Sequence, residues 1–183
     1  DLIDIPPEMM VAGNNAIAES YIHPGIQLSV ANMIEVMITE SDNTATDVCL
    51  ELAGGAEAVT KKLRSIGIKE QRADRSTAEI LMDFYGLQDK ASPSVVAEAV
   101  AKDPALLVQM TKANMEFEKD PRDQSTPKAM LELLLAIDNG TALSEKIREF
   151  LLGVMSRTST GGRRLRGLLP KGTPVADKTG TIG

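Results

Sequence analysis

Apolar side chains recur with the spacing of an α-helix through most of the middle of the chain. The first stripe runs from Leu28 to Ile38 and predicts a helix that ends before Ser41. The same spacing predicts further helices over positions 49–53, 59–66, 95–100, 106–117, 130–137 and 147–154. Glycines follow three of these stripes, at 54–55, 67 and 140, where glycine commonly ends a helix. The centre of the chain is therefore predicted to be helical.

The two ends of the chain follow a different pattern. Pro6 and Pro7 block a helix near the first residue, so residues 1–7 are expected to be extended. Residues 175–183 resemble the beginning of a strand, and a single strand needs neighbours for its backbone donors and acceptors. We therefore expect an α+β fold in which a helical lobe packs on an antiparallel sheet. Residues 1–183 would form part of one larger domain: mainly the helical lobe and the start of one strand.

The amino-acid composition limits which partners and which reactive groups the chain can have. The chain has 183 residues, of which 43% are hydrophobic, and a formal net charge of −6, so we expect a packed core and no nucleic-acid partner. No apolar run approaches the ~18 residues of a membrane span. One cysteine, Cys49, and one histidine, His23, argue against a disulfide, a metal site or a histidine-based triad. No cofactor is expected, and hydroxyl, amide, carboxylate, lysine and arginine groups must supply any chemistry.

Two short strings carry candidate chemistry. Ser-Asp-Asn at 41–43 directly follows the first helical stripe, and Lys-Thr-Gly-Thr at 178–181 lies on the expected C-terminal strand. Taken alone, the first could simply cap a helix and the second could be an edge strand that bends at glycine. Their occurrence together, in this order and separated by a helical lobe, is far more specific.

The pair resembles the signature of the serine β-lactamase and penicillin-binding-protein superfamily, S-x-x-K, S-D-N and K-T-G, and most of all class A β-lactamases. The stretches at 23–28, 122–127, 160–166 and 169–170 also resemble that class. The resemblance covers most of the chain except residues 76–119, which we interpret as a helical insertion, with a helical pair at 92–119, that enlarges the family's Ω-loop region.

The resemblance implies a serine acyl hydrolase that opens a β-lactam ring through an acyl-enzyme. Ser41 would relay a proton to the leaving nitrogen beside the ammonium group of Lys178, and the Thr181 N–H would be an oxyanion donor. Asp42 would be a buried support for loop amides. The substrate-binding residues implied by the resemblance are Asn43, Thr179, Gly180, Thr181 and Arg164, although Arg164 could equally belong to a solvated basic turn.

Two parts of the family pattern are missing or altered. The nucleophilic S-x-x-K is expected outside the chain, before Asp1, so the chain alone should not form an acyl-enzyme. One S-x-x-K does occur, at 125–128, but Ser125 is interpreted as the cap of a helix that begins near Pro127. Thr77 occupies the position expected for the deacylating glutamate. Glu79 is either a displaced base or a surface acid of a helix.

Other residues receive structural predictions. Arg75 and Asp123 match the family's salt bridge at the base of the Ω-loop, so this bridge is expected beneath the enlarged loop. Asn14 lies where the resemblance implies a residue of the cleft wall, but we interpret it as a turn residue in a left-handed conformation.

Alternatives remain open at this stage. A penicillin-binding D,D-peptidase or esterase relative that deacylates slowly would explain Thr77, and a non-catalytic module of the same fold would explain a missing nucleophile. The expected partner is a small β-lactam or an acyl-D-Ala-D-Ala-like molecule. By resemblance the protein is periplasmic or secreted, and we expect a monomer.

Overall fold

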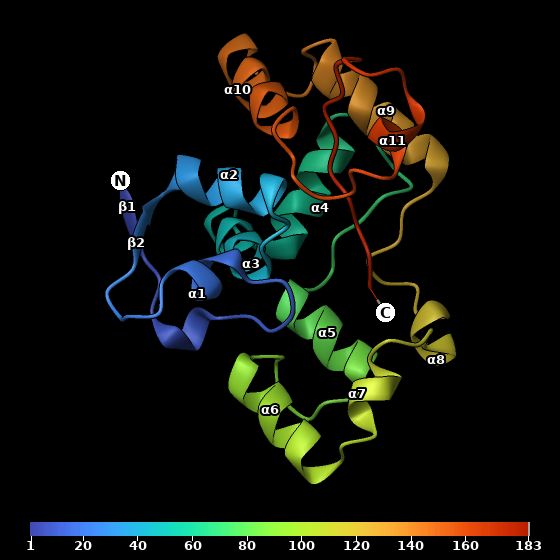
Figure 1. Cartoon of the computed structure of the whole chain (residues 1–183). Coiled ribbons are helices and arrows are strands. Elements are labelled where there is room, and N and C mark those ends of the chain that lie inside the picture. Colours follow the sequence, from blue (N-terminus) through green and yellow to red (C-terminus); the bar gives the residue numbers. More distant parts are fainter. Residues whose placement is uncertain (183) are drawn as a thin grey trace.

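The computed structural model describes residues 1–182 and is mostly helical (Figure 1). A one-turn 3-10 helix (Pro7–Met9) lies between the first strand and the first α-helix. The remaining elements, in chain order, are β1 (Leu2–Asp4), α1 (Ala16–Ser20), β2 (Gln27–Ser29), α2 (Val30–Thr39), α3 (Asn43–Leu52), α4 (Gly55–Ser65), α5 (Thr77–Tyr85), α6 (Pro93–Lys102), α7 (Leu106–Gln109), α8 (Met115–Glu118), α9 (Pro127–Asp138), α10 (Glu145–Met155) and α11 (Leu165–Leu168).

The strands form a small antiparallel sheet at one end of the molecule. β1 pairs with β2 so that Ile3 lies opposite Leu28. Leu28 therefore belongs to a strand rather than to the helix predicted from its stripe. The helix begins after Ser29, whose side chain accepts a hydrogen bond from the backbone N–H of Asn32 and so caps α2.

The core joins the N-terminal segment to α2 and α3. Its first cluster contains Ile5, Ile17, Met33, Ala45 and Val48, each at most 4% exposed. α2 packs against α3, α3 against α4 and α5, and α10 against α2. The loop between α2 and α3, which carries the Ser-Asp-Asn string, is thus anchored on both sides by buried apolar contacts.

A second cluster fixes α5 in place. Val11 and Ala12 of the N-terminal segment pack against Ala78 and Leu81 of α5 and against Ala91. The periodicity analysis did not predict α5, nor the short α1. The start of α5 is marked by a capping box, Ser76 with Glu79, which is a sequence signal for a helix N-terminus.

Residues 76–119 contain α5 to α8. The expected helical pair at 92–119 is wrong in detail, because three helices occur there. Asn114 interrupts the 106–117 stripe: its side-chain oxygen accepts hydrogen bonds from the backbone N–H groups of Glu116 and Phe117 and starts α8. The cap formed by Asn114 therefore starts a new helix where the apolar stripe predicted that one helix would continue.

The predicted C-terminal strand is not formed within the described residues. The segment at 174–182 crosses the molecule without a strand partner (Figure 1). It is attached instead to the segment that follows α10, where the Asp177 N–H donates to the Met155 carbonyl at 3.3 Å and Thr158 Oγ1 donates to the Asp177 carbonyl at 2.6 Å. A strand assignment requires a ladder of backbone bonds, and these two contacts do not form one. Gly183, the last residue of the predicted strand, lies outside the described residues.

Two features are absent from residues 1–182. No helix there has the length and apolar character needed to cross a membrane. No group of three or more histidine, cysteine or carboxylate side chains in the same residues is arranged to hold a metal ion.

Candidate active site

Ser41 and Lys178 meet at the centre of the candidate site. The Lys178 ammonium group donates a hydrogen bond of 2.7 Å to Ser41 Oγ, although 137 positions separate the two residues. Ser41 joins α2 to α3 and has a positive φ of 58°, a conformation that is uncommon for residues other than glycine. The loop therefore holds the Ser41 hydroxyl in a strained but fixed position.

Asn14 holds the same loop from the opposite side. Its side-chain nitrogen donates to the Ser41 carbonyl at 3.1 Å and also to the Glu40 carbonyl, and its own carbonyl accepts the Asn43 N–H at 2.8 Å. Asn14 is not among the residues with positive φ, so the left-handed conformation predicted for it is wrong. The local sequence around Asn14 does not predict these three contacts, because they join segments that are far apart in the chain. Only the family resemblance indicated a place in the cleft wall.

Asp42 and Asn43 complete the beginning of α3. Asp42 is fully buried, and its two carboxylate oxygens accept the Ala45 N–H at 2.7 Å and the Ile17 N–H at 2.9 Å. Burial raises the pKa of Asp42, and these backbone hydrogen bonds oppose that shift. Asn43 donates from its side chain to the Ala12 carbonyl at 2.7 Å, which fixes the orientation of its amide.

The environment of Lys178 lowers its pKa. The residue as a whole is exposed, but its ammonium end lies against Ser41 and the Thr179 carbonyl. This partial desolvation shifts the pKa below the usual lysine value, and the nearby Asp177 carboxylate opposes the shift. Asp177 is itself paired with Arg166 at 2.6 Å.

Three hydroxyls and a guanidinium group line the site beyond Lys178. Thr179 Oγ1 lies 2.7 Å from Thr160 Oγ1, and Arg164 donates to Thr181 Oγ1 at 2.7 Å and to the Gly180 carbonyl at 3.3 Å. Arg164 lies in an exposed turn, and its guanidinium group reaches the Lys-Thr-Gly-Thr string. Donors from four residues face the same region and together suit an anionic group.

Close packing explains one glycine in this wall. A Cβ atom on Gly161 would lie 2.5 Å from Thr179 Cγ2, and Gly161 also has a positive φ of 68°. Both the contact and the backbone conformation favour glycine at this position. Ser159 holds the same segment to the end of α2, because its N–H and its hydroxyl each contact the Thr39 carbonyl at 2.9 Å.

Several of these side chains, Ser41, Asn43 and Thr179 among them, line one cavity of about 350 Å³, which Lys178 adjoins through its contact with Ser41. Leu81 and Tyr85 of α5, which were not predicted as site residues, form part of its wall. No lining residue of this cavity among positions 1–182 carries a carboxylate group. The lining consists of Gly13, Asn14, Ser41, Asn43, Leu81, Tyr85, Thr160, Gly161, Arg164, Thr179, Thr181 and Ile182.

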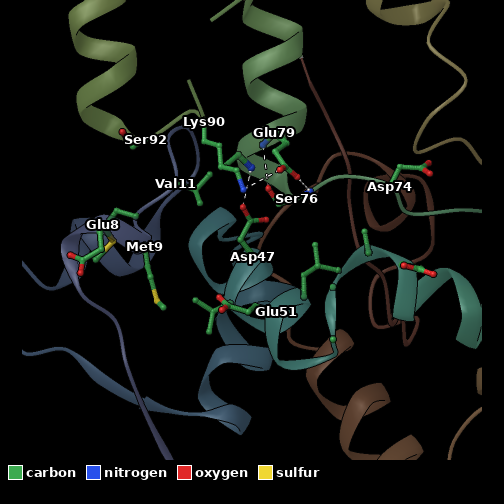
Figure 2. A pocket seen from close by; sticks show the side chains of 18 residues that line it. Glu8, Met9, Val11, Asp47, Glu51, Asp74, Ser76, Glu79, Lys90 and Ser92 are labelled. Atoms are coloured by element: carbon green, nitrogen blue, oxygen red, sulfur yellow. Dashed lines mark hydrogen bonds and ion pairs between the residues drawn. The ribbon is translucent and has the colours of Figure 1, made fainter. Parts of the chain in front are cut away.

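Glu79 lines a different cavity, of about 750 Å³ (Figure 2). Its carboxylate accepts the Ser76 N–H at 2.8 Å and pairs with Lys90 at 3.0 Å. The hydrogen bond from Ser76, helped by Lys90, holds the pKa of Glu79 below its usual value. The structure therefore does not bring Glu79 to Ser41. It gives this side chain the contacts of a helix cap.

Thr77, at the position expected for a glutamate, begins α5. Its N–H donates to one carboxylate oxygen of Asp47 at 2.6 Å, and the Ala78 N–H donates to the other at 2.9 Å. Asp47 lies one turn beyond Asn43 in α3 and points toward the N-terminus of α5 (Figure 2). Through Asp47, α3 thus holds the helix that carries Leu81 and Tyr85.

Arg75 and Asp123 form an ion pair at the base of the 76–119 segment. Arg75 Nε donates to Asp123 at 2.6 Å, and Arg75 Nη1 contacts Asp83 at 2.6 Å and Asp120 at 3.1 Å. The Arg75 guanidinium also stacks 5.2 Å from the centre of the Phe117 ring. Because the Arg75 side chain is only 5% exposed, these contacts form in a largely desolvated setting.

The predicted cap of α9 is wrong by one residue. α9 begins at Pro127, so the cap is Thr126, whose hydroxyl accepts the Ala129 N–H at 3.1 Å. Ser125 instead forms a bridge with Gln71. Ser125 and Lys128 do not line the Ser41 cavity.

Comparisons with known proteins agree with this geometry. A family model described as the β-lactamase enzyme family matches residues 1–183. The β-lactamase VEB-1 of Pseudomonas aeruginosa is 28% identical over 183 residues, which are 99% of this chain and 50% of that protein. The β-lactamase OXY-2 of Klebsiella oxytoca is 32% identical over 164 residues, covering 90% of this chain and 44% of that protein.

Solved structures give the same result. An ancestral class A β-lactamase, of the last common ancestor of Gram-negative bacteria, has a TM-score of 0.73 and 33% identity, covering 100% of this chain and 56% of that structure. A β-lactamase from Chitinophaga pinensis has a TM-score of 0.71 and 26% identity, covering 98% and 54%. The chain spans about half the length of these relatives. The fold is the helical part of a class A β-lactamase, and the chain belongs to the β-lactamase enzyme family.

Proposed function

We propose that this chain supplies the proton-relay and carboxylate-binding part of the active site of a serine hydrolase that opens β-lactam rings. The observation that carries the proposal is the hydrogen bond from Lys178 to Ser41, whose side chain lines a cavity together with Asn43, Thr179 and Thr181. Hydroxyl, ammonium and amide groups converge there without a histidine. Such a set suits acyl transfer to a serine better than metal-dependent or histidine-dependent hydrolysis.

In the proposed reaction, Ser41 carries a proton to the leaving nitrogen. As the carbon–nitrogen bond of the ring breaks, Ser41 Oγ gives its hydrogen to that nitrogen and takes up the proton released by the attacking hydroxyl. Lys178 stays protonated, holds Ser41 Oγ by its hydrogen bond and favours the negative charge that develops nearby. No net proton is consumed in this step.

The same cavity would orient the substrate. The substrate carboxylate is proposed to bind Thr179 and Thr181 with help from Arg164, whose guanidinium already contacts Thr181. Gly180 lets the backbone approach closely, and the Thr181 N–H is proposed as an oxyanion donor. The Asn43 side-chain oxygen would accept the amide N–H of the acyl group, since its nitrogen is bound to the Ala12 carbonyl.

The nucleophilic serine and its lysine are proposed to come from outside residues 1–183. Ser125 and Lys128, which have the right spacing, lie at the start of α9 and outside the Ser41 cavity. Relatives about twice as long as this chain leave room for such a segment. Periplasmic or secreted localisation and a monomeric state also belong to this proposal. Both come from the family resemblance.

The test is acylation of the full-length protein followed by mass spectrometry. A β-lactam should add its whole mass to the protein, and the Ser41→Ala and Lys178→Ala variants should acylate far more slowly. The Lys128→Ala variant, on the exposed start of α9, is the control and should acylate at the normal rate. Normal acylation of the first two variants would refute the proposal.

A second candidate is a penicillin-binding D,D-peptidase or esterase relative that acylates but deacylates slowly. It is favoured by the lack of a carboxylate among the described lining residues of the Ser41 cavity and by the engagement of Glu79 elsewhere. The lifetime of the acyl adduct separates the two. Rapid release with β-lactam turnover supports the hydrolase, whereas an adduct that persists for hours supports the second candidate.

A further inference from the structure

The segment at 11–14 forms part of the wall of the Ser41 cavity and lies against the first turn of α3. The Ala12 carbonyl accepts a hydrogen bond from the side-chain nitrogen of Asn43 at 2.7 Å. A Cβ atom on Gly13 would lie only 2.8 Å from the same nitrogen, which shows how closely this backbone lies against the amide. The orientation of the Asn43 side chain therefore depends on where this backbone is held.

The same backbone is held by Ala91, which belongs to the loop between α5 and α6. The Ala12 N–H donates to the Ala91 carbonyl at 2.8 Å. Ala12 and Ala91 are both buried, so a break in this bond would leave a buried donor without a partner. Ala12 thus connects Ala91, through its N–H, with Asn43, through its carbonyl.

Ala91 is in turn fixed to α5. Its N–H donates to the Ala78 carbonyl at 3.1 Å, and its methyl group belongs to the apolar cluster that also contains Ala78 and Leu81. The preceding residue, Lys90, pairs with Glu79 of α5 at 3.0 Å (Figure 2). A backbone bond, a buried methyl group and an ion pair therefore keep this loop on α5.

These contacts close a ring that starts and ends on α3. Asp47 of α3 holds the N-terminus of α5, and α5 holds Ala91. Ala91 holds Ala12, and Ala12 holds Asn43 at the start of α3. A side chain that binds substrate keeps its orientation only when the groups behind it are themselves fixed.

From this ring we infer that Ala91 is a positioning residue for recognition of the acyl amide of the substrate. By holding Ala12, it keeps the Asn43 side-chain oxygen directed toward the amide N–H of the acyl group. Ala91 does not line the Ser41 cavity, so it acts on the substrate only through Asn43. The inference rests on the proposed function for the role of Asn43, whereas the coupling of Ala91 to Asn43 does not.

Two variants of the full-length protein disturb the contact between Ala12 and Ala91 in different ways. Ala91→Val adds two methyl groups at a fully buried position and should push the two backbones apart. Replacing Ala12 by lactic acid turns the preceding amide into an ester. This removes the N–H that Ala91 binds and keeps every side chain and the Ala12 carbonyl. Ala97→Val, at an exposed position of α6, is the matched control.

The first measurement follows the side-chain amide of Asn43 by NMR with labelled asparagine. In Ala91→Val and in the ester variant this signal should shift, and its hydrogens should exchange with solvent about fivefold faster, as for the loss of one hydrogen bond. The signal of Asn32, which is exposed on α2, should not change. Ala97→Val should leave both signals as they are. An unchanged Asn43 signal in both test variants would overturn the inference.

The second measurement distinguishes positioning from a general loss of structure. Two β-lactams with the same ring nucleus and carboxylate are compared by kcat/KM, one with an acetamido group and one with no substituent at that position. Ala91→Val and the ester variant should lower kcat/KM for the acetamido compound about fivefold relative to the unsubstituted compound. In the Asn43→Ala background this selective loss should disappear, because the two residues act as a coupled pair.

The outcomes separate the inference from the proposed function. If Asn43→Ala discriminates between the two compounds but neither test variant does, the inference fails and the proposed function stands. Equal losses on both compounds in the test variants likewise indicate a merely structural role for Ala91 and overturn the inference. If neither compound acylates the native protein, the proposed function fails, and the NMR signal of Asn43 decides whether Ala91 positions that side chain.

Discussion

The hydroxyl of Ser41 accepts its hydrogen bond from Lys178 while the backbone of Ser41 stays in a left-handed conformation, with φ at 58°. The two facts are linked. A loop that turns directly from α2 into α3 needs this backbone conformation, and the turn directs the hydroxyl toward the C-terminal segment rather than into the helix. The local strain is offset by the hydrogen bonds that the buried Asp42 carboxylate, on the same loop, accepts from the Ile17 N–H in α1 and the Ala45 N–H in α3.

Two substitutions of Ser41 distinguish the role of its hydroxyl in acylation from the backbone strain at its positive φ. Ser41→Ala and Ser41→Gly both remove the hydroxyl, so each should lower the acylation rate by ~10²–10⁴-fold if Ser41 relays the proton. Only the glycine variant also removes the Cβ atom that disfavours positive φ, and it should be more stable than the alanine variant by about 1 kcal/mol. Urea unfolding and stopped-flow acylation check the two effects. Equal stability of the two variants would contradict the strain argument.

Deprotonation of Lys178 should set the pH above which kcat/KM falls. Because its pKa is lowered, kcat/KM should begin to fall with rising pH before the ~10.4 of an unperturbed lysine, as the ammonium loses its proton. Lys178→Arg keeps a positive charge that does not titrate in this range, so the basic limb should disappear even if the maximal rate is lower. Lys128→Arg, outside the cavity, should leave the limb unchanged. A persistent limb in Lys178→Arg would assign it to another group.

Gly161 and Thr179 should behave as a coupled pair. In Gly161→Ala the new Cβ displaces Thr179, which should cost about 1–3 kcal/mol of substrate binding and appear mainly in KM. Thr179→Ser removes the methyl group that causes the clash but keeps the hydroxyl. The double variant should therefore recover part of the loss, and a double-mutant cycle in kcat/KM measures the coupling. If the two substitutions change kcat/KM additively, the contact between position 161 and the Thr179 methyl group does not affect substrate binding.

Asp123 allows the ion pair at the base of the 76–119 segment to be tested without a change of backbone. Asp123 has a positive φ of 53°, which asparagine also tolerates, so Asp123→Asn keeps the backbone but removes the charge and one of the two oxygens that accept the Arg75 Nε–H and the Asp74 and Arg75 N–H groups. We expect a loss of about 2 kcal/mol in unfolding free energy, below the ~3–5 kcal/mol of a fully buried pair. Glu149→Gln on α10 is the control and should change stability little. A neutral result for Asp123→Asn would mean that Asp83 and Asp120 compensate.

Asp47 should hold α5 against α3. Asp47→Asn leaves one oxygen and one NH₂ group opposite two N–H donors, so one donor of Thr77 or Ala78 loses its partner, at a cost of about 1–3 kcal/mol. Amide hydrogen exchange should accelerate along α5 in this variant. Glu51→Gln, also on α3 but exposed, is the matched control. Unchanged exchange in α5 would show that the capping box alone is sufficient.

Local signals in the sequence determined much of this protein. The apolar stripes identified α2, α3, α4, α6, α9 and α10, because helical periodicity records which face of a segment is buried. The order of the Ser-Asp-Asn and Lys-Thr-Gly strings identified the family. The pairing of Arg75 with Asp123 was expected from the resemblance, and both residues are ion-paired in the structure.

Tertiary structure alone decided the remaining features. The pairing of Glu79 with Lys90 depends on how α5 packs, whereas the Ser76–Glu79 capping box that holds the same carboxylate is a local signal. Asn14 became part of the site through contacts with carbonyl groups more than 25 positions away. The segment around Lys178 takes no strand conformation among the described residues, because a strand is defined by its partner and not by its own side chains. Periodicity reports burial within one element, whereas hydrogen-bond partners between distant elements are chosen only when those elements pack together.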